Sequence, residues 1–161
     1  ISADHLSIVA GYVTAAARDG SNFHSGGAQR ASNAGQYLDP TIVSGVTEDM
    51  AIAREEVFGP VLSVLTFESI EKALRIVNNT PYGLSAGVWS ASIDTCMSVA
   101  RGVRSGTVWV NTFMEGYPEL PFGGYKQSGI GRELGKRAVE DYTEEKTIQF
   151  HRGQRTGWWV G

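Results

Sequence analysis

The chain has 161 residues, of which 42% are hydrophobic and 19% are charged, a composition typical of one folded domain and unlike that of disordered or collagen-like chains. Its 14 basic and 17 acidic residues give a net charge of -3, which argues against a broad electrostatic attraction to nucleic acid or anionic lipid. No apolar run approaches the ~18 residues that a bilayer span requires. We therefore expect neither a nucleic-acid partner nor a membrane.

The cysteine and histidine content limits the chemistry that the chain can carry. Cys96 is the single cysteine, so no intramolecular disulfide can form, and the three histidines are too scattered for metal-ligand spacing. We expect a reducing compartment, the cytoplasm, and no metal. Cys96 lies in a helical pattern without a basic neighbour in sequence, which is typical of a buried structural thiol rather than a nucleophile. Because the chain begins with Ile1, we allow that it is a piece of a longer protein, and no targeting signal can be read from it.

The first third of the chain predicts a helix, a loop and a short strand. Ser2 can cap a helix that ends near Gly20 and whose apolar side chains recur at helical spacing. These side chains are Leu6, Val9, Ala10, Val13, Ala16 and Ala17. Residues 21–36 are polar and rich in glycine, which indicates a surface loop that can hold a short strand. A short apolar strand is expected at 41–46, followed by a turn or short helix at 47–56.

Strands and helices alternate over residues 61–111. Apolar strands are expected at 61–67, 84–89 and 106–111. One helix begins after the cap Ser69, and another covers 92–101. Single helices between strands predict right-handed crossovers and therefore an α/β fold with an open, doubly wound parallel sheet. Ligands of such sheets bind beyond the carboxyl ends of the strands, which directs attention to the residues after Asn111.

Residues 112–131 combine aromatic side chains and glycines without periodicity, and a loop of this length is usually functional. A helix at about 133–141 and an alternating strand at 144–151, with Ile148 and Phe150 on one face, are expected to follow. We place the boundary of the main unit after residue 142, so that 143–161 form a strand and a tail.

The glycines near residue 130 do not make a convincing nucleotide-binding loop. Segment 129–135 has its third glycine one position late for a dinucleotide fingerprint, and no strand leads directly into it. Segment 131–136 is one residue short of a P-loop, and Arg137 replaces the required hydroxyl residue. These glycines are expected to allow tight backbone turns.

Segment 55–60 leads directly into the first strand of the α/β unit. Glu55 and Glu56 are adjacent, so their side chains diverge and do not form a paired-carboxylate site. Glu56 can accept two hydrogen bonds from the vicinal hydroxyls of a ribose, and the ring of Phe58 can pack against a heterocycle. A solvated Glu56 and a buried Phe58 are the more common arrangement for these residue types, so on the residues alone both interpretations stay open.

Four motifs in order resemble the C-terminal third of the NAD(P)-dependent aldehyde dehydrogenase family, and the resemblance covers essentially the whole chain. The motifs are EEVFGPV at 55–61, NNTPYGL at 78–84, GTVWVN at 106–111 and PFGGYKQSGIGRE at 121–133. The resemblance implies that residues 1–142 form the second half of the family's catalytic domain and that 143–161 carry its oligomerisation strand. The stretches 119–122 and 125–128 look most like the betaine-aldehyde-dehydrogenase-like branch.

The resemblance also implies roles for individual residues. Glu56 would hold the nicotinamide ribose of NAD or NADP, and Phe58 would pack beside that ribose and the nicotinamide. Phe113, Tyr117 and Phe122 would form the wall of a tunnel for a small-molecule aldehyde. The strand at 144–151 implies a homo-oligomer, and its apolar side chains, together with Trp158 and Trp159, predict that the chain self-associates.

Family catalysis uses a cysteine thiolate, a glutamate-activated water and an asparagine. The motifs that carry these groups lie before the matched part, so no catalytic residue is expected here, and Cys96 does not replace the nucleophile. We therefore expect a portion of an oxidoreductase that oxidises an aldehyde to a carboxylic acid with NAD(P), itself inactive. The alternative is a non-catalytic binding or assembly module that retains the fold. A third interpretation, a small cation-binding protein, rests on aromatic rings near Glu115 and Glu119.

Overall fold

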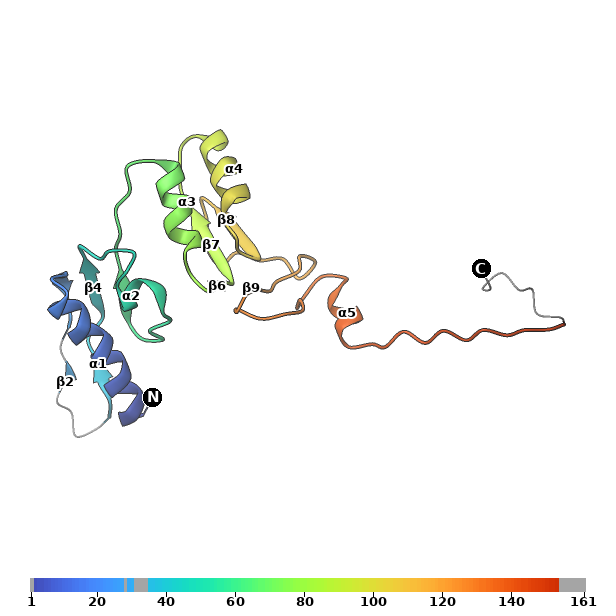
Figure 1. Cartoon of the computed structure of the whole chain (residues 1–161), viewed down its shortest axis with the longest axis horizontal. Helices are drawn as coiled ribbons and strands as arrows, with labels where there is room; N and C mark the ends of the chain where they lie inside the picture. Colours follow the sequence, from blue (N-terminus) through green and yellow to red (C-terminus); the bar gives the residue numbers. More distant parts are fainter. Residues whose placement is uncertain (1, 28, 31–34, 154–161) are drawn as a thin grey trace, which may run out of the picture.

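The computed structural model describes residues 2–27, 29–30 and 35–153 (Figure 1). The helices and strands form two neighbouring groups. The first group runs from α1 to β5 and the second from α3 to β9, and a short helix, α5, and an extended segment follow them (Figure 1).

The first group packs a long helix on a small mixed sheet. Helix α1 (Ala3–Arg18) begins where the Ser2 side chain accepts a hydrogen bond from the His5 amide. The sheet has the order β1 (Asn22–Ser25), β4 (Thr41–Ser44), β5 (Val61–Ser63). Strand β1 is antiparallel to β4, and β4 is parallel to β5, to which it is linked through α2 (Ala51–Arg54). The buried core of this group consists of Ala16, Val43, Val46 and Ile52.

A two-stranded antiparallel pair, β2 (Gln29–Arg30) and β3 (Tyr37–Leu38), lies within the segment predicted as a loop and just after it. Its strands are two residues long each. The described part of 21–36 therefore holds two short strands, β1 and β2, where a surface loop with a short strand was predicted.

The second group contains two helices and two small sheets. Helix α3 (Ile70–Asn78) begins at the predicted cap Ser69, and α4 (Ile93–Gly102) begins one residue after the predicted start, with Ser92 as its cap; both serines accept hydrogen bonds from backbone amides. Helix α4 packs on the parallel pair β7 (Ser85–Val88) and β8 (Thr107–Val110), and α3 packs on α4. Strand β6 (Tyr82–Gly83) pairs with β9 (Tyr125–Lys126) in antiparallel fashion.

The α/β character and the parallel pairings agree with the sequence prediction, but one doubly wound sheet over residues 61–111 does not form in the described chain. Strand β5 pairs with β4, whereas β7 and β8 make a separate sheet. The alternation of helices and strands predicts crossovers, but it does not say which strand is the neighbour of which. The apolar run at 61–67 is a strand only as far as Ser63.

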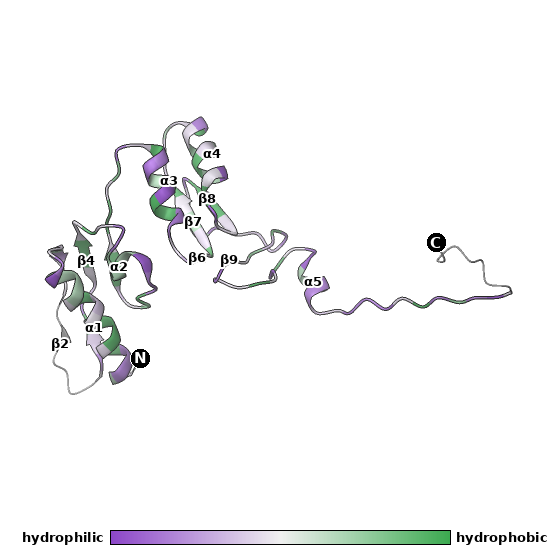
Figure 2. Ribbon diagram, in the orientation of Figure 1, coloured by the Kyte–Doolittle hydropathy of each residue, from purple (hydrophilic) through white to green (hydrophobic). Residues whose placement is uncertain are grey.

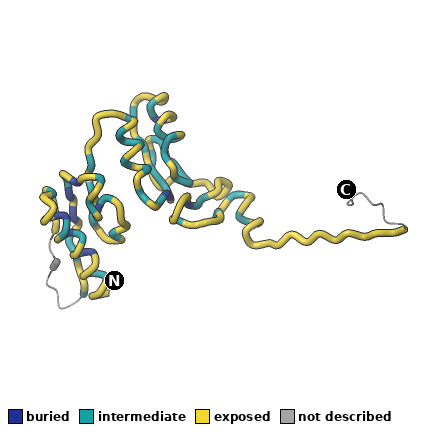
Figure 3. The backbone as a smooth tube through the Cα atoms, viewed as in Figure 1, coloured by how far each residue is buried: buried dark blue, intermediate teal, exposed yellow. Residues whose placement is uncertain are grey.

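The C-terminal elements differ from the prediction. The helix expected at 133–141 is reduced to α5 (Ala138–Asp141) after a turn in which Gly135 has a φ of 62°. Residues 144–151 form no strand but run as an exposed, extended segment (Figure 3), with Ile148 80% and Phe150 84% exposed. A strand requires a neighbour for its backbone N–H and C=O groups, and no other described segment pairs with this one. Trp158 and Trp159 lie outside the described residues.

The chain buries little of its surface. It exposes 12454 Å², whereas a compact monomer of this mass exposes about 7,900 Å². Exposed residues alternate with half-buried ones along most of the backbone (Figure 3). Helices α1 and α3 carry both apolar and polar residues (Figure 2). None of the described helices has the length and apolarity needed to cross a bilayer.

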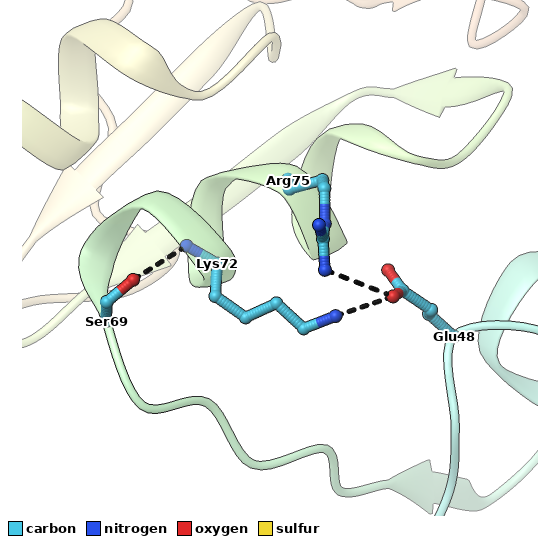
Figure 4. A network of polar contacts seen from close by, with 4 residues as sticks. All are labelled: Glu48, Ser69, Lys72 and Arg75. Carbon is cyan, nitrogen blue, oxygen red and sulfur yellow. Dashed lines mark hydrogen bonds and ion pairs between the residues drawn. The ribbon is translucent and has the colours of Figure 1, made fainter.

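Glu48 links the two groups. Its Oε1 accepts a hydrogen bond from Lys72 Nζ at 2.5 Å and lies 3.4 Å from Arg75 Nη2 (Figure 4). The two cations point from the same face of α3 because they are three residues apart. The hydrogen bond from Lys72, reinforced by both positive charges, holds the pKa of Glu48 below its ordinary value of 4.5.

We expect Glu48→Gln to lower the free energy of unfolding at pH 7, by a modest amount because the ion pair is partly exposed and screened by salt. Since the pKa of Glu48 is lower in the folded state, its contribution to stability is present above pH 4.5 and is lost as the pH falls through the folded-state pKa. Urea denaturation at pH 7 and at about pH 3 measures the difference. Glu68→Gln, which removes an exposed acid just before α3, is the control. A Glu48→Gln effect of equal size at both pH values would contradict the assignment.

Candidate functional site

Segment 55–60, the first of the four motifs, is held against one face of α1. His5 Nε2 donates a hydrogen bond to the Phe58 carbonyl oxygen at 2.8 Å. Tyr12 donates its hydroxyl proton to Glu55 Oε2, with the two oxygens 2.6 Å apart. Between these two contacts the backbone at Gly59 approaches Val9 so closely that an added Cβ would lie 2.6 Å from Val9 Cγ1. His5, Val9 and Tyr12 follow helical spacing, so a single face of α1 makes all three contacts.

Val57 is the one residue of segment 55–60 that is not exposed. Val57 packs against the buried core cluster, whereas its neighbours Glu56 and Phe58 are exposed. Phe58 has a φ of 52° and is 69% exposed, with its ring edge-on to that of His5 at a centroid distance of 6.4 Å. The interpretation of Phe58 as a core residue is therefore wrong, while Glu56 is exposed as either interpretation requires. A carboxylate and an aromatic ring are thus presented to solvent from a fixed backbone.

Glu56 and Phe58 line different cavities. Phe58 lines a small one of about 220 Å³ together with His5 and Tyr37. Glu56 lines an open groove of about 720 Å³ whose walls come from residues 53–56, 77–87, 103–105 and 127–128. Residues of three of the four motifs therefore meet around the groove of Glu56.

Hydrogen bonds join the second and the fourth motif beside this groove. The Gly83 amide donates to Ser128 Oγ at 2.9 Å, and the Gln127 amide donates to the Pro81 carbonyl at 2.9 Å. Lys126 Nζ donates to the carbonyl oxygens of Asn78 and Thr80, both at 3.1 Å, at the C-terminal end of α3. A cation is favourable at this end of a helix because the last carbonyl groups carry partial negative charge.

The predicted tunnel residues Phe113 and Tyr117 lie on the exposed loop after β8. Phe113 packs edge-on against Trp109, with ring centroids 5.1 Å apart, and lies 6.5 Å from the ring of Trp89. Trp89 follows β7 and Phe113 follows β8, so this aromatic cluster lies at the carboxyl ends of the parallel pair, where ligands of α/β sheets bind. Trp89 and Trp109 are not among the predicted site residues, because their relation to Phe113 depends on the pairing of β7 with β8, which the sequence does not show.

Phe122 lies elsewhere, in the fourth motif. Its backbone exchanges two hydrogen bonds with that of Glu133, at 2.7 and 2.8 Å, and its side of the loop lines a cavity of about 610 Å³. The Arg132 amide donates to Asp141 Oδ2 at 2.7 Å, which ties the loop to α5. Among the described contacts, none joins Phe122 to Phe113 or Tyr117.

Cys96 is completely buried on α4, and its Sγ lies 3.6 Å from the Ser90 carbonyl oxygen. The predicted burial of this thiol is confirmed.

Comparison with known proteins decides the family. Residues 1–148 match the model of the aldehyde dehydrogenase family. The chain belongs to the aldehyde dehydrogenase family. Betaine aldehyde dehydrogenase of Bacillus subtilis is 46% identical over 151 residues, which is 92% of this chain and 31% of that protein. The crystal structure of the NAD-dependent aldehyde dehydrogenase from Sinorhizobium meliloti matches with a TM-score of 0.90 and 44% identity over 99% of this chain and 32% of that one.

A second solved structure adds the coenzyme. The indole-3-acetaldehyde dehydrogenase AldA of Pseudomonas syringae, in complex with NAD+ and IAA, matches with a TM-score of 0.85 and 46% identity over 89% of this chain and 29% of that one. The chain spans 27–31% of the length of the curated relatives. The prediction of the family from four motifs is therefore confirmed, and these structural relatives are NAD-dependent enzymes.

Two of the family motifs meet at Gly106, where the backbone approaches the fourth motif. An added Cβ at Gly106 would lie 1.7 Å from the Gly123 carbonyl oxygen. Because the obstacle is backbone, it can move only with its loop. We expect Gly106→Ala to lower the free energy of unfolding by about 1–3 kcal/mol. Gly116→Ala is the matched control, since nothing lies within 4 Å of its added Cβ. Equal stability of the two variants in urea denaturation would show that this approach does not occur.

Proposed function

We propose that residues 1–142 are the C-terminal portion of an aldehyde dehydrogenase catalytic domain, and that 143–161 carry its oligomerisation segment. The whole protein would oxidise a small-molecule aldehyde to a carboxylic acid with NAD. The observation that carries this proposal is the match to NAD-dependent relatives over 89–99% of the chain but only 29–32% of their length. The two separate parallel pairs, β4–β5 and β7–β8, support it, because they leave strand edges for further strands to complete one sheet.

In this proposal Glu56 and Phe58 hold the nicotinamide end of the coenzyme, and we call them the coenzyme clamp. The exposed carboxylate of Glu56 can accept hydrogen bonds from both ribose hydroxyls, and the exposed ring of Phe58 offers a flat face beside them. The hydrogen-bonding capacity of Glu56 suits a ribose and the flat ring of Phe58 suits a nicotinamide, which supports this part of the proposal. NAD, when bound, accepts the hydride removed from the substrate.

The aromatic cluster at the carboxyl ends of β7 and β8 supports a substrate site. Phe113 and Tyr117, and Phe122 from the fourth motif, would form part of the tunnel wall, with Trp89 and Trp109 behind Phe113. Aromatic faces attract quaternary ammonium groups. This preference, together with the similarity to the Bacillus subtilis enzyme, favours a betaine-aldehyde-like substrate.

The 161 residues alone would be inactive. Cys96 is buried, and the relatives are about three times longer, so the nucleophile, the general base and the remaining coenzyme contacts would come from residues outside this chain. The free thiol of Cys96 supports a reducing compartment such as the cytoplasm. The exposed Ile148 and Phe150 support assembly into a homo-oligomer.

We expect the purified 161-residue chain to produce no NADH with betaine aldehyde, measured by absorbance at 340 nm.

In the full-length enzyme, Glu56→Gln should raise KM for NAD+ about tenfold or more, because hydrogen bonds to a charged carboxylate are lost. Glu68→Gln is the control and should leave KM unchanged. Steady turnover by the short chain would refute its inactivity. A full-length protein that oxidises no aldehyde from a broad panel would support the non-catalytic module instead.

We also expect the 161-residue chain to self-associate, because it exposes far more total surface than a compact monomer does, and many large apolar side chains are exposed on it. Light scattering at increasing concentration should give a mass above 17.4 kDa. Removal of residues 143–161 should weaken the association. A monodisperse monomer at high concentration would contradict the expectation.

A further inference from the structure

Helix α1 contacts the coenzyme clamp at Phe58 and at Glu55, the residue before Glu56. His5 binds the carbonyl of Phe58, and Tyr12 binds the side chain of Glu55, which precedes Glu56. His5 and Tyr12 are 53 and 44 residues away from the clamp in sequence, so neither contact follows from local structure. We propose that His5 and Tyr12 are positioning residues for coenzyme binding, an inference that rests on the proposed function of Glu56 and Phe58.

His5 acts on the backbone of Phe58. Phe58 has a φ of 52°, and this left-handed conformation costs free energy for a residue with a Cβ. One hydrogen bond contributes a net free energy of similar size. The bond from His5 Nε2 therefore helps to keep the left-handed conformation that turns the ring toward solvent. The His5 ring also contacts the Phe58 ring edge-on, which restricts its rotation.

His5 is itself fixed in place. Its amide donates to the cap residue Ser2 at 3.1 Å, and its helix is anchored by the buried side chains of Val9, Val13 and Ala16. Since a carbonyl oxygen only accepts hydrogen bonds, Nε2 must carry the proton. The contact therefore requires a donor at this place but not a positive charge.

Tyr12 acts on the direction of Glu56. Glu55 has extended backbone angles, φ -105° and ψ 154°, and successive side chains of an extended segment point to opposite sides. The bond from Tyr12 therefore fixes the direction of Glu55 and, through the extended backbone, that of its neighbour Glu56; both residues line the open groove. The same hydrogen bond raises the pKa of the Tyr12 hydroxyl above its ordinary value of 10.0, so tyrosine remains a donor at neutral pH.

The test uses steady-state kinetics of the full-length enzyme. His5→Ala should raise KM for NAD+ about three- to tenfold, because one positioning hydrogen bond is lost. Its kcat at saturating NAD+ and its KM for the aldehyde should change less than about twofold. Tyr12→Phe, which keeps the ring in the core, should also raise KM for NAD+. A general loss of folding would instead lower the fraction of active enzyme and therefore kcat.

A conservative variant gives the sharpest discrimination. His5→Gln places an amide Nε2 donor at a similar reach, so it should restore KM for NAD+ to within about twofold of the unsubstituted enzyme. His24→Ala is the matched control, since His24 binds Ser44 on β4 rather than the clamp, and it should leave KM for NAD+ unchanged. The melting temperature of every variant reports separately on folding.

Glu56→Gln separates the two levels of the proposal. If it raises KM for NAD+ while His5→Ala and Tyr12→Phe do not, the clamp stands and the positioning role is overturned. If Glu56→Gln also has no effect, the clamp itself is wrong. If His5→Gln is as impaired as His5→Ala, a hydrogen bond to the Phe58 carbonyl is not what His5 supplies, and the inference fails.

Discussion

The burial of α1 against the sheet β1–β4–β5 is the interaction on which the candidate site depends. Ala16 of the helix, Val43 of the central strand and Ile52 of α2 pack in one buried cluster, and Val57 lies against it. Val57 stands between Glu56 and Phe58, so the contact that anchors the core also fixes the residue at the centre of the proposed coenzyme clamp. Small changes in this packing are therefore expected to reach the clamp directly.

The rest of the molecule is defined by what it leaves exposed. The two helix and strand groups are joined by Glu48 with Lys72 and Arg75, and by the groove walls, rather than by a common apolar core. In the described chain, β5 has no strand on its outer edge, the parallel pair β7–β8 is joined by no third strand, and the extended C-terminal segment pairs with nothing. These open surfaces agree with a chain that spans less than a third of the length of its relatives.

Local signals in the sequence predicted local structure well. Helices α1, α3 and α4 each begin after a serine cap, at Ser2, Ser69 and Ser92. A cap and an apolar periodicity both depend only on residues that are close together in the sequence. Strand pairing could not be predicted in the same way. Strand β5 pairs with β4 through a short crossover at α2, and 144–151 has the alternation of a strand but no neighbour to pair with.

The candidate site was predictable only in part. The motifs predicted Glu56 and Phe58 as site residues. The structure adds that both are exposed and that Glu56 lines an open groove. The contacts of His5 and Tyr12 could not be predicted, because neither residue has a local signal and their partners are more than 40 residues away. The packing of Trp89 and Trp109 around Phe113 could not be predicted either, since it depends on β7 and β8 being neighbours.

A crystal structure of the full-length enzyme with NAD+ bound would show directly whether Glu56 and Phe58 hold the coenzyme. We predict that the Glu56 carboxylate oxygens lie within about 2.6–3.2 Å of the hydroxyls of the nicotinamide ribose. The Phe58 ring should lie beside that ribose, with its carbonyl still bound to His5. A coenzyme bound away from Glu56 and Phe58, with the Glu56 side chain in solvent, would contradict it.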